Sequence, residues 1–312
     1  MITYHPPITE IWTGRAAEKP LYWHQNISLI DLESTKDSFP AESHVLLGYA
    51  VDEGVLRNLG RKGAAAGPQM IRKSLGGMAW HHGKKHVYDA GDILLEGLDL
   101  ESVHSLVTEK VAQIFNENGK PILLGGGHDL ALAHFRAIKD SRHTAKKIGI
   151  INLDAHFDLR KPEGRMATSG TPFYQIKNDW PDTEYLVLGI QQCANNAELF
   201  EAADHLQTQY MLAEDFSLAN WAAIQSRVDK FIDKVDAIYL TIDMDGFSSA
   251  YAPGVSAPSA LGFEPTVVLK VIDYLKTTNK LISVDIVECN PDYDRDGRTS
   301  GLASQLIFRL TI

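Results

Sequence analysis

Short apolar runs alternate with amphipathic segments along most of this chain. The runs are Val45 to Tyr49, Pro121 to Leu124, Lys147 to Leu153, Tyr185 to Ile190, Asp236 to Ile242 and Leu281 to Val287. Continuous apolar character over about four to eight residues is typical of strands that are buried on both faces of a parallel sheet. The pattern therefore predicts a three-layer α/β/α fold with a doubly wound, mostly parallel sheet.

The segments between these runs carry apolar residues at helical spacing. One set is Val103, Leu106, Val107, Val111, Ile114 and Phe115, and another is Trp221, Ile224, Val228, Phe231 and Ile232. Pro265 precedes a third such set and suits the first turn of a helix, where its missing N–H costs nothing. We expect one catalytic domain over residues 1–312, with residues 1–42 as an N-terminal extension packed on it.

Composition excludes two large classes of partner. The formal net charge of −10 disfavours binding to nucleic acid or to an anionic membrane surface, because both require a basic face. The two cysteines are too few for a disulfide framework, and the amino terminus lacks the basic start and apolar stretch of a signal peptide. The sequence predicts a cytoplasmic protein.

Three apolar runs end in residues that are typical metal ligands. The set contains two histidines and four aspartates: His128, Asp154, His156, Asp158, Asp243 and Asp245. Residues two apart in an extended chain point to the same face, so the ligands within each cluster can converge. So many carboxylates with only two imidazoles favour two hard, octahedral ions, and manganese is our first choice.

Other polar residues near strand ends have simpler interpretations. Asp129, His104, His134 and His143 stand outside any convergent pattern and are expected to be structural. The glycines of Gly125-Gly-Gly127 lack the lysine of a phosphate loop, so they are expected to bring the backbone close to the metals.

The metal-type clusters resemble those of the arginase and agmatinase family of ureohydrolases. The resemblance extends from about Gly48 to the end, and includes a Gly-Pro helix start within Gly63 to Arg72 and an acidic strand end at Val284 to Pro291. It implies a three-layer α/β fold, a binuclear manganese centre and a homo-oligomer.

The same resemblance implies a role for each cluster residue. One ion would bind His128, Asp154, Asp158 and Asp243, and the other would bind Asp154, His156, Asp243 and Asp245. A hydroxide bridging the two ions would attack the substrate carbon, and Asp158 would pass its proton to the leaving nitrogen. Glu288 would face the cationic nitrogen end of the substrate.

One departure from arginases indicates the substrate. Phe173 stands where arginases have a histidine that assists proton transfer, and Asp158-Leu-Arg160 with Ser169-Gly-Thr171-Pro-Phe173 resembles the formimidoylglutamase branch. That branch hydrolyses N-formimidoyl-L-glutamate to L-glutamate and formamide in histidine degradation. The predicted substrate-binding residues are Arg160, Glu288, Asn58, Arg61, Ser169, Thr171 and Phe173, with the Arg160 guanidinium gripping a carboxylate.

Two alternatives stay open at this stage. The chain could be another ureohydrolase that acts on a guanidino compound such as agmatine, guanidinobutyrate or arginine, although Phe173 and Arg160 count against this. It could also be a catalytically silent subunit for binding or assembly, which would be expected to have lost metal ligands. All six proposed ligands are present.

Overall fold

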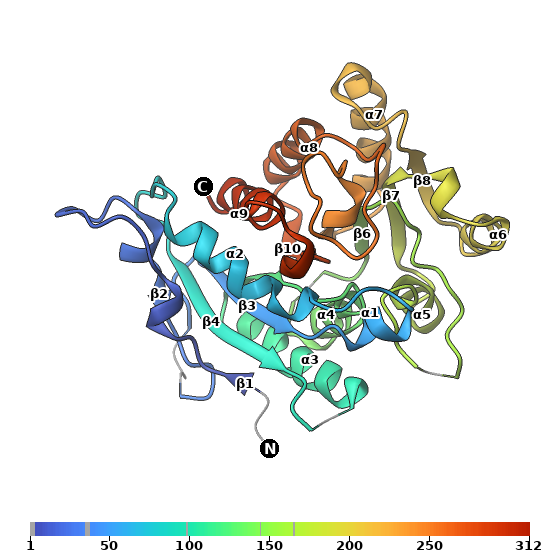
Figure 1. Ribbon diagram of the computed structural model, residues 1–312. Coiled ribbons are helices and arrows are strands. Elements are labelled where there is room, and N and C mark those ends of the chain that lie inside the picture. Colours follow the sequence, from blue (N-terminus) through green and yellow to red (C-terminus); the bar gives the residue numbers. More distant parts are fainter. Residues whose placement is uncertain (1–3, 35–37, 98, 144, 165) are drawn as a thin grey trace.

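The computed structural model describes residues 1–312 except 1–3, 35–37, 98, 144 and 165 (Figure 1). Its centre is a ten-stranded sheet in the order β1-β4-β3-β5-β10-β9-β6-β7-β8, with β2 paired to β4. The strands are β1 (Tyr4–His5), β2 (Ser28–Leu29), β3 (His44–Ala50), β4 (Val87–Leu94), β5 (Lys120–Leu124), β6 (Ile148–Leu153), β7 (Glu184–Ile190), β8 (Gln209–Leu212), β9 (Ala237–Asp243) and β10 (Leu281–Val287). All neighbouring pairs are parallel except β1 with β4.

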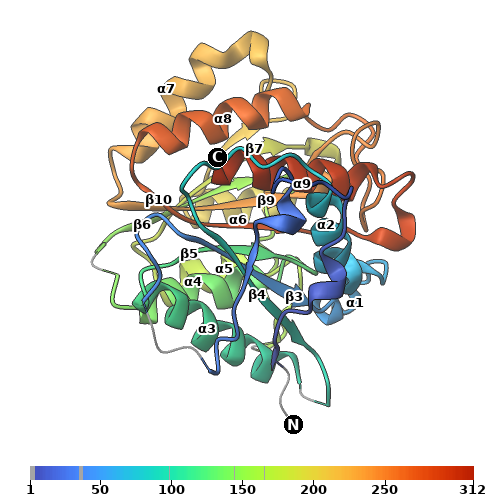
Figure 2. The same ribbon diagram turned by 90° about the vertical axis from the view of Figure 1, so that its left-hand side faces the viewer.

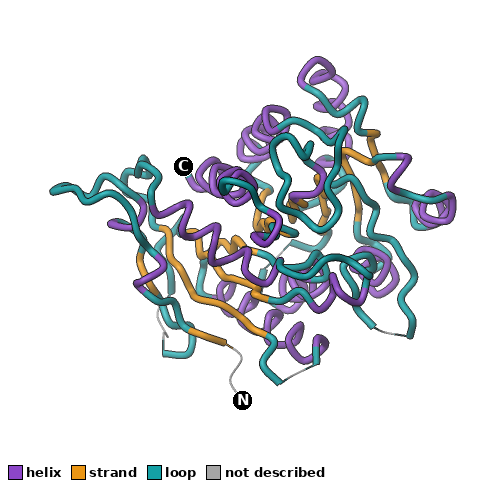
Figure 3. The backbone as a smooth tube through the Cα atoms, viewed as in Figure 1, coloured by secondary structure: helices purple, strands orange, loops and turns teal. Residues whose placement is uncertain are grey.

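Helices cover both faces of the sheet and form the outer layers (Figures 1 and 2). One face carries α2 (Gly67–Gly76), α7 (Trp221–Ile232), α8 (Pro265–Thr277) and α9 (Arg298–Thr311). The other carries α3 (Leu100–Asn116), α4 (Leu130–Asp140) and α5 (Pro172–Asp179). The short α1 (Glu53–Arg57) follows β3, and α6 (Ala197–His205) leads into the edge strand β8 (Figure 3).

These layers confirm the predicted three-layer fold. All six apolar runs form strands, and the predicted helical segments form α3, α7 and α8. Pro265 occupies the first turn of α8, as its position in the sequence predicts. Among the described residues, no helix combines the length and the apolar character that crossing a bilayer requires.

The N-terminal segment joins the sheet at the edge formed by β4. Tyr4 of β1 pairs with Ile93, and Ser28 of β2 pairs with Tyr88. The buried side chains of Trp12 and Trp23 pack in the core layer beneath α2. The segment is therefore held both by backbone hydrogen bonds and by apolar burial.

Buried ion pairs join β4 to α2. The Arg72 guanidinium is fully buried and donates to Asp89 Oδ1 from Nε at 3.0 Å and to Asp92 Oδ1 from Nη1 at 2.7 Å. It also donates to the carbonyl oxygen of Gly91, and Trp12 Nε1 donates to Asp89 Oδ2 at 2.8 Å. We call Arg72, Asp89 and Asp92 the Arg72 cluster.

The sheet order brings four carboxyl-terminal strand ends together. Strands β5, β10, β9 and β6 are consecutive neighbours, so the loops that follow them share one edge. The loop after β5 lies so close to β3 that a Cβ on Gly126 would be 1.8 Å from the carbonyl oxygen of Val51. Only glycine permits this approach, which places the next residues directly over the neighbouring strand ends.

Candidate metal centre

The six metal-type residues follow three of the four strands β5, β10, β9 and β6. His128 lies in the loop between β5 and α4, and Asp243 is the last residue of β9. Asp154, His156 and Asp158 follow β6, and Asp245 lies in the 3-10 turn that follows β9. These strands lie within the consecutive order β5-β10-β9-β6 at the middle of the sheet, so the loops that follow them meet there.

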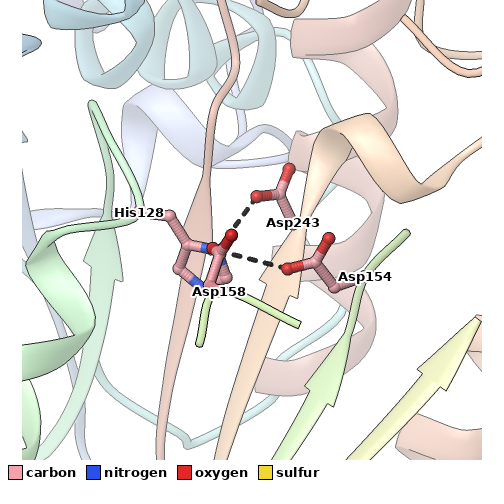
Figure 4. Close-up of side chains that lie close together, drawn as sticks. All are labelled: His128, Asp154, Asp158 and Asp243. Carbon is pink, nitrogen blue, oxygen red and sulfur yellow. Dashed lines mark ion pairs between the residues drawn. The ribbon is translucent and has the colours of Figure 1, made fainter. Parts of the chain in front are cut away.

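Four of these side chains point toward one another (Figure 4). His128 Nδ1 lies 3.0 Å from Asp158 Oδ2, 3.0 Å from Asp243 Oδ2 and 3.4 Å from Asp154 Oδ2. The four ligand atoms lie within 4.8 Å of one another. His128 Nδ1 is buried yet takes part in no hydrogen bond, as expected of an atom that coordinates a cation.

A second group shares Asp154 with the first. His156 Nδ1 lies 3.4 Å from Asp154 Oδ1 and 3.4 Å from Asp245 Oδ1. Asp245 Oδ1 is buried without a hydrogen-bond partner. Asp154 thus turns one carboxylate oxygen toward each group, which is the arrangement that a ligand bridging two ions requires.

The structure places Asp243 in one of the two groups. It belongs to the group around His128, but it is not among the residues that converge around His156. Its Oδ1 accepts a hydrogen bond from the backbone N–H of Asp245 at 2.7 Å, just as Asp154 Oδ1 accepts one from the backbone N–H of His156 at 2.7 Å. Asp154 is therefore the residue that the two groups share, and the second bridging role predicted for Asp243 stays a prediction.

The electrostatics of the site require positive charge. Burial, together with the charges of Asp245 and Asp154, raises the pKa of Asp243 well above its usual range. Burial and the charge of Asp154 raise the pKa of Asp158 from 3.8 to about 6. Burial opposes protonation of His128, but its three carboxylate neighbours outweigh this and raise its pKa. Divalent cations would relieve the repulsion among these carboxylates, so the donor set fits two such ions.

Two carboxylates of the site are held in strained backbone conformations. Asp158 has φ of 49° and Glu288 has φ of 65°, in the left-handed region that disfavours residues with a side chain. Such strain persists only where the surrounding structure enforces it. The backbone is bent at these two positions to aim the carboxyl groups at the centre.

A cavity of about 300 Å³ opens above the carboxylates. Glu288 lies on its wall, and Glu288 Oε1 accepts the backbone N–H of His128 at 2.9 Å. Burial and the charge of Asp245 raise the pKa of Glu288 to about 8. Of the predicted site residues, the cavity is also lined by His128, His156, Asp158, Asp243, Asp245, Asn58, Arg61, Arg160 and Ser169.

Asn58 and Arg160 meet over Gly170 at the cavity wall. A Cβ on Gly170 would lie 2.9 Å from Asn58 Oδ1 and 3.0 Å from Arg160 Cδ. The backbone N–H of Arg160 donates to the carbonyl oxygen of Gly170 at 2.9 Å, which ties the two segments together. The Arg160 side chain is exposed at this wall, where its guanidinium can reach a ligand.

Three predicted substrate-binding residues make contacts within the chain, and their roles in substrate binding stay predictions. Arg61 lines the cavity, but its guanidinium donates to the carbonyl oxygens of Val255 and Ser256 and stacks 3.7 Å above the Tyr293 ring. Phe173 is fully buried outside the cavity lining, with its ring centroid 5.2 Å from that of His128. Thr171 is also buried outside the lining, where its hydroxyl bonds within the turn at Thr168.

Asn195 also lines the cavity, although its sequence context does not single it out. Asn195 Oδ1 accepts the backbone N–H of Phe157 at 3.0 Å, and Nδ2 donates to the carbonyl oxygen of Ala155 at 2.9 Å. It thereby fixes the chain on both sides of His156. In the sequence, Asn195 is only a polar residue in the turn after β7, and such residues are too common to predict a role in a site.

The fold and the site together define a binuclear metal-dependent hydrolase. Residues 42–312 match the arginase family, and the chain therefore belongs to that family. The formimidoylglutamase of Aeromonas salmonicida (strain A449) is 38% identical over 309 residues, which cover 96% of this chain and 96% of that protein. The formimidoylglutamase of Geobacillus kaustophilus (strain HTA426) is 37% identical, covering 96% of this chain and 94% of the relative.

Solved structures share the same fold. The crystal structure of formimidoylglutamase from Bacillus subtilis superposes with a TM-score of 0.84 at 21% identity, covering 96% of this chain and 93% of that one. Trypanosoma cruzi formiminoglutamase with two Mn²⁺ gives a TM-score of 0.78 at 25% identity, covering 90% of this chain and 95% of that one.

Proposed function

We propose that this protein hydrolyses N-formimidoyl-L-glutamate to L-glutamate and formamide with two manganese ions. Two observations together support this proposal. Two groups of carboxylates and imidazoles converge in the structure, and the chain is similar to formimidoylglutamases over nearly its full length. His128, Asp154, Asp158 and Asp243 would hold one ion, and Asp154, His156 and Asp245 the other. When bound, such a pair of ions polarises the substrate and activates water near neutral pH.

In this proposal, Asp158 moves the proton of the reaction. Its Oδ2 lies 3.0 Å from His128 Nδ1 in the first group, and Asp158 also lines the cavity. A carboxylate in this position would accept a proton from the attacking water and then donate it to the leaving nitrogen. The reaction balances, because one water molecule is added, glutamate leaves as the free amine and formamide is released.

Glu288 and Arg160 can distinguish the two ends of the substrate. Glu288 lies within the site, where its carboxylate can pair with the cationic formimino group. Arg160 lies on the cavity wall beside Asn58, where its planar guanidinium can form two hydrogen bonds with a carboxylate. Arg61 instead holds the loop at Val255 and Ser256 and shapes the wall.

Phe173 supports this substrate class indirectly. Its ring stacks on that of Tyr185 at 4.4 Å and contacts the His128 ring edge to face, so it supports a metal ligand from behind. A phenylalanine cannot transfer protons, so proton movement depends on Asp158.

The resemblance also predicts a homo-oligomer, which size-exclusion chromatography with light scattering would test.

A product-resolved assay tests the proposed function. Purified protein with added Mn²⁺ is given N-formimidoyl-L-glutamate, arginine, agmatine and guanidinobutyrate in parallel, and formamide, glutamate and urea are quantified separately. Formamide and glutamate from the first substrate alone are expected. Release of urea from a guanidino substrate would support the metal-dependent hydrolysis and contradict the proposed substrate. No turnover with two bound Mn²⁺ would favour a catalytically silent subunit.

A further inference from the structure

A row of buried polar side chains lies beneath the metal centre, between β9, β10 and α4. Its members are Thr241, Tyr239, Asp285, His134 and Ser283, and each is at most 2% exposed. Burying polar groups away from water is costly unless they are hydrogen-bonded to one another. The proposed reaction uses none of them directly.

The row is connected to His128 at one end. His128 Nε2 lies 2.9 Å from Thr241 Oγ1. Thr241 stands directly opposite Asp285 in the register of β9 and β10, and it lies two residues from Tyr239, so both side chains project from the same face of β9. Burial and the charge of Asp285 raise the pKa of the Tyr239 phenol, and Thr241 opposes this rise, as a hydroxyl that donates to the phenol oxygen would. Tyr239 in turn donates its hydroxyl proton to Asp285 Oδ2.

The other end of the row reaches α4. His134 Nδ1 lies 2.8 Å from the same oxygen, Asp285 Oδ2, and His134 Nε2 lies 2.5 Å from Ser283 Oγ. Asp285 is therefore the common acceptor of both branches. One branch leads to a metal-type residue, and the other ends in the packing between α4 and β10.

The direction of donation follows from the chemistry of the acceptor. A carboxylate only accepts, so Tyr239 donates to Asp285, and Thr241 can donate to the Tyr239 oxygen. The Thr241 oxygen is then free to accept the Nε2 proton of His128. This order leaves the Nδ1 lone pair of His128 facing Asp158 and Asp243, both at 3.0 Å.

We propose that Asp285 is a positioning residue for the metal site at His128, acting through Tyr239 and Thr241. The chain holds the His128 ring in one orientation and in the tautomer whose Nδ1 can bind a cation. Histidine ligands commonly donate their second ring N–H to a partner in this way, but here two hydroxyls extend the link to the carboxylate. The inference rests on the proposed metal centre and is independent of the substrate.

A purely structural role makes a different prediction. If the row only joined α4 to β10, removing any of its buried hydroxyls would lower stability and leave the affinity for metal unchanged. Tyr239 and Ser283 separate these roles, because each contributes one buried hydroxyl but only Tyr239 lies between Asp285 and His128.

The test is calorimetric titration of metal-free protein with MnCl₂, with thermal unfolding measured in parallel. Tyr239→Phe removes one hydroxyl and keeps the ring, and we expect it to weaken one of two Mn²⁺ binding steps by about 10-fold, at the lower end of effects for such partners. Asp285→Asn is expected to act on the same step. Ser283→Ala is the matched control, which should lower the melting temperature without changing either step.

Thr241 supplies a second test that preserves packing. Thr241→Val is nearly isosteric and should weaken the same step, whereas Thr241→Ser keeps the hydroxyl and should restore it. Combined with Tyr239→Phe, Thr241→Val should add little further loss, because both break one chain. Unchanged Mn²⁺ affinity in Tyr239→Phe and Thr241→Val, or an equal loss in Ser283→Ala, would overturn the proposal.

Discussion

Two clusters of buried charge lie on the same sheet and are neutralised in opposite ways. In the Arg72 cluster, the guanidinium donors reach Asp89, Asp92 and the carbonyl oxygen of Gly91. At the metal centre, four aspartates and two histidines converge with His128 Nδ1 and Asp245 Oδ1 left without hydrogen bonds. The first cluster is complete within the chain, whereas the second requires cations that the chain does not supply.

The contrast separates a structural role from a functional one. Buried charges are costly to leave unpaired, so a fold that only needed stability would pair them internally, as β4 and α2 do. Convergent acidic groups with raised pKa values, such as Asp158 and Glu288, instead indicate a site that is built for a ligand.

The largest expected effect comes from the shared ligand Asp154. Asp154→Asn removes a negative charge that both groups use, so both Mn²⁺ ions should bind more weakly. Losing several kcal/mol of metal stabilisation in the transition state should lower kcat/KM by about 1,000-fold or more. Metal content after dialysis and steady-state kinetics measure the two effects. Retention of two Mn²⁺ per chain by the variant would contradict the bridging role.

The Arg72 cluster should respond in the opposite sense. Arg72→Met leaves Asp89 buried without its cation, which should lower the free energy of unfolding by about 3 to 5 kcal/mol. The folded protein should keep its Mn²⁺ affinity and its kcat, because the cluster lies outside the metal centre. Urea unfolding combined with metal titration checks both points. A loss of Mn²⁺ affinity at unchanged stability would break the distinction between the clusters.

The same contrast explains what the sequence could predict. The metal ligands were recognisable because each cluster follows an apolar strand at a spacing that makes its members converge. Strand β4 escaped recognition because Asp89 and Asp92 interrupt its apolar pattern, and only the distant Arg72 makes the burial of Asp89 tolerable. The partner of Arg61 was equally hidden, since the carbonyl oxygens of Val255 and Ser256 carry no sequence signal.

Arg160 tests the substrate side of the site. Removing its guanidinium in Arg160→Ala should raise KM for N-formimidoyl-L-glutamate by roughly 10- to 150-fold, because charged hydrogen bonds contribute about 1.5 to 3 kcal/mol. Both Mn²⁺ ions should remain bound. Lys161→Ala is a matched control, since this neighbouring cation lines a different hollow. An unchanged KM in Arg160→Ala would remove this residue from carboxylate recognition.

The smallest effect concerns the metal-free protein and its dependence on pH. The pKa of Asp158 is raised from 3.8 to about 6, and that of Glu288 from 4.5 to about 8. An acid whose pKa is higher in the folded state binds more protons there than in the unfolded chain. Stability therefore falls as pH rises from about 4 to about 8. The raised pKa values of His128 and His156 act in the same direction, since their contribution is lost as pH rises.

Bound Mn²⁺ should reverse this trend, because the cation competes with protons for the same groups and binds more tightly as they ionise. The melting temperature in chelator should fall by a few degrees between about pH 5.5 and about pH 8, and added Mn²⁺ should stabilise the protein most at the higher pH. Arg72→Met provides the comparison, because the Arg72 cluster remains distant from this site and its loss should lower both curves without changing their slopes. A metal-free protein that became more stable with rising pH would show that the carboxylates at the centre are neutralised by the chain itself.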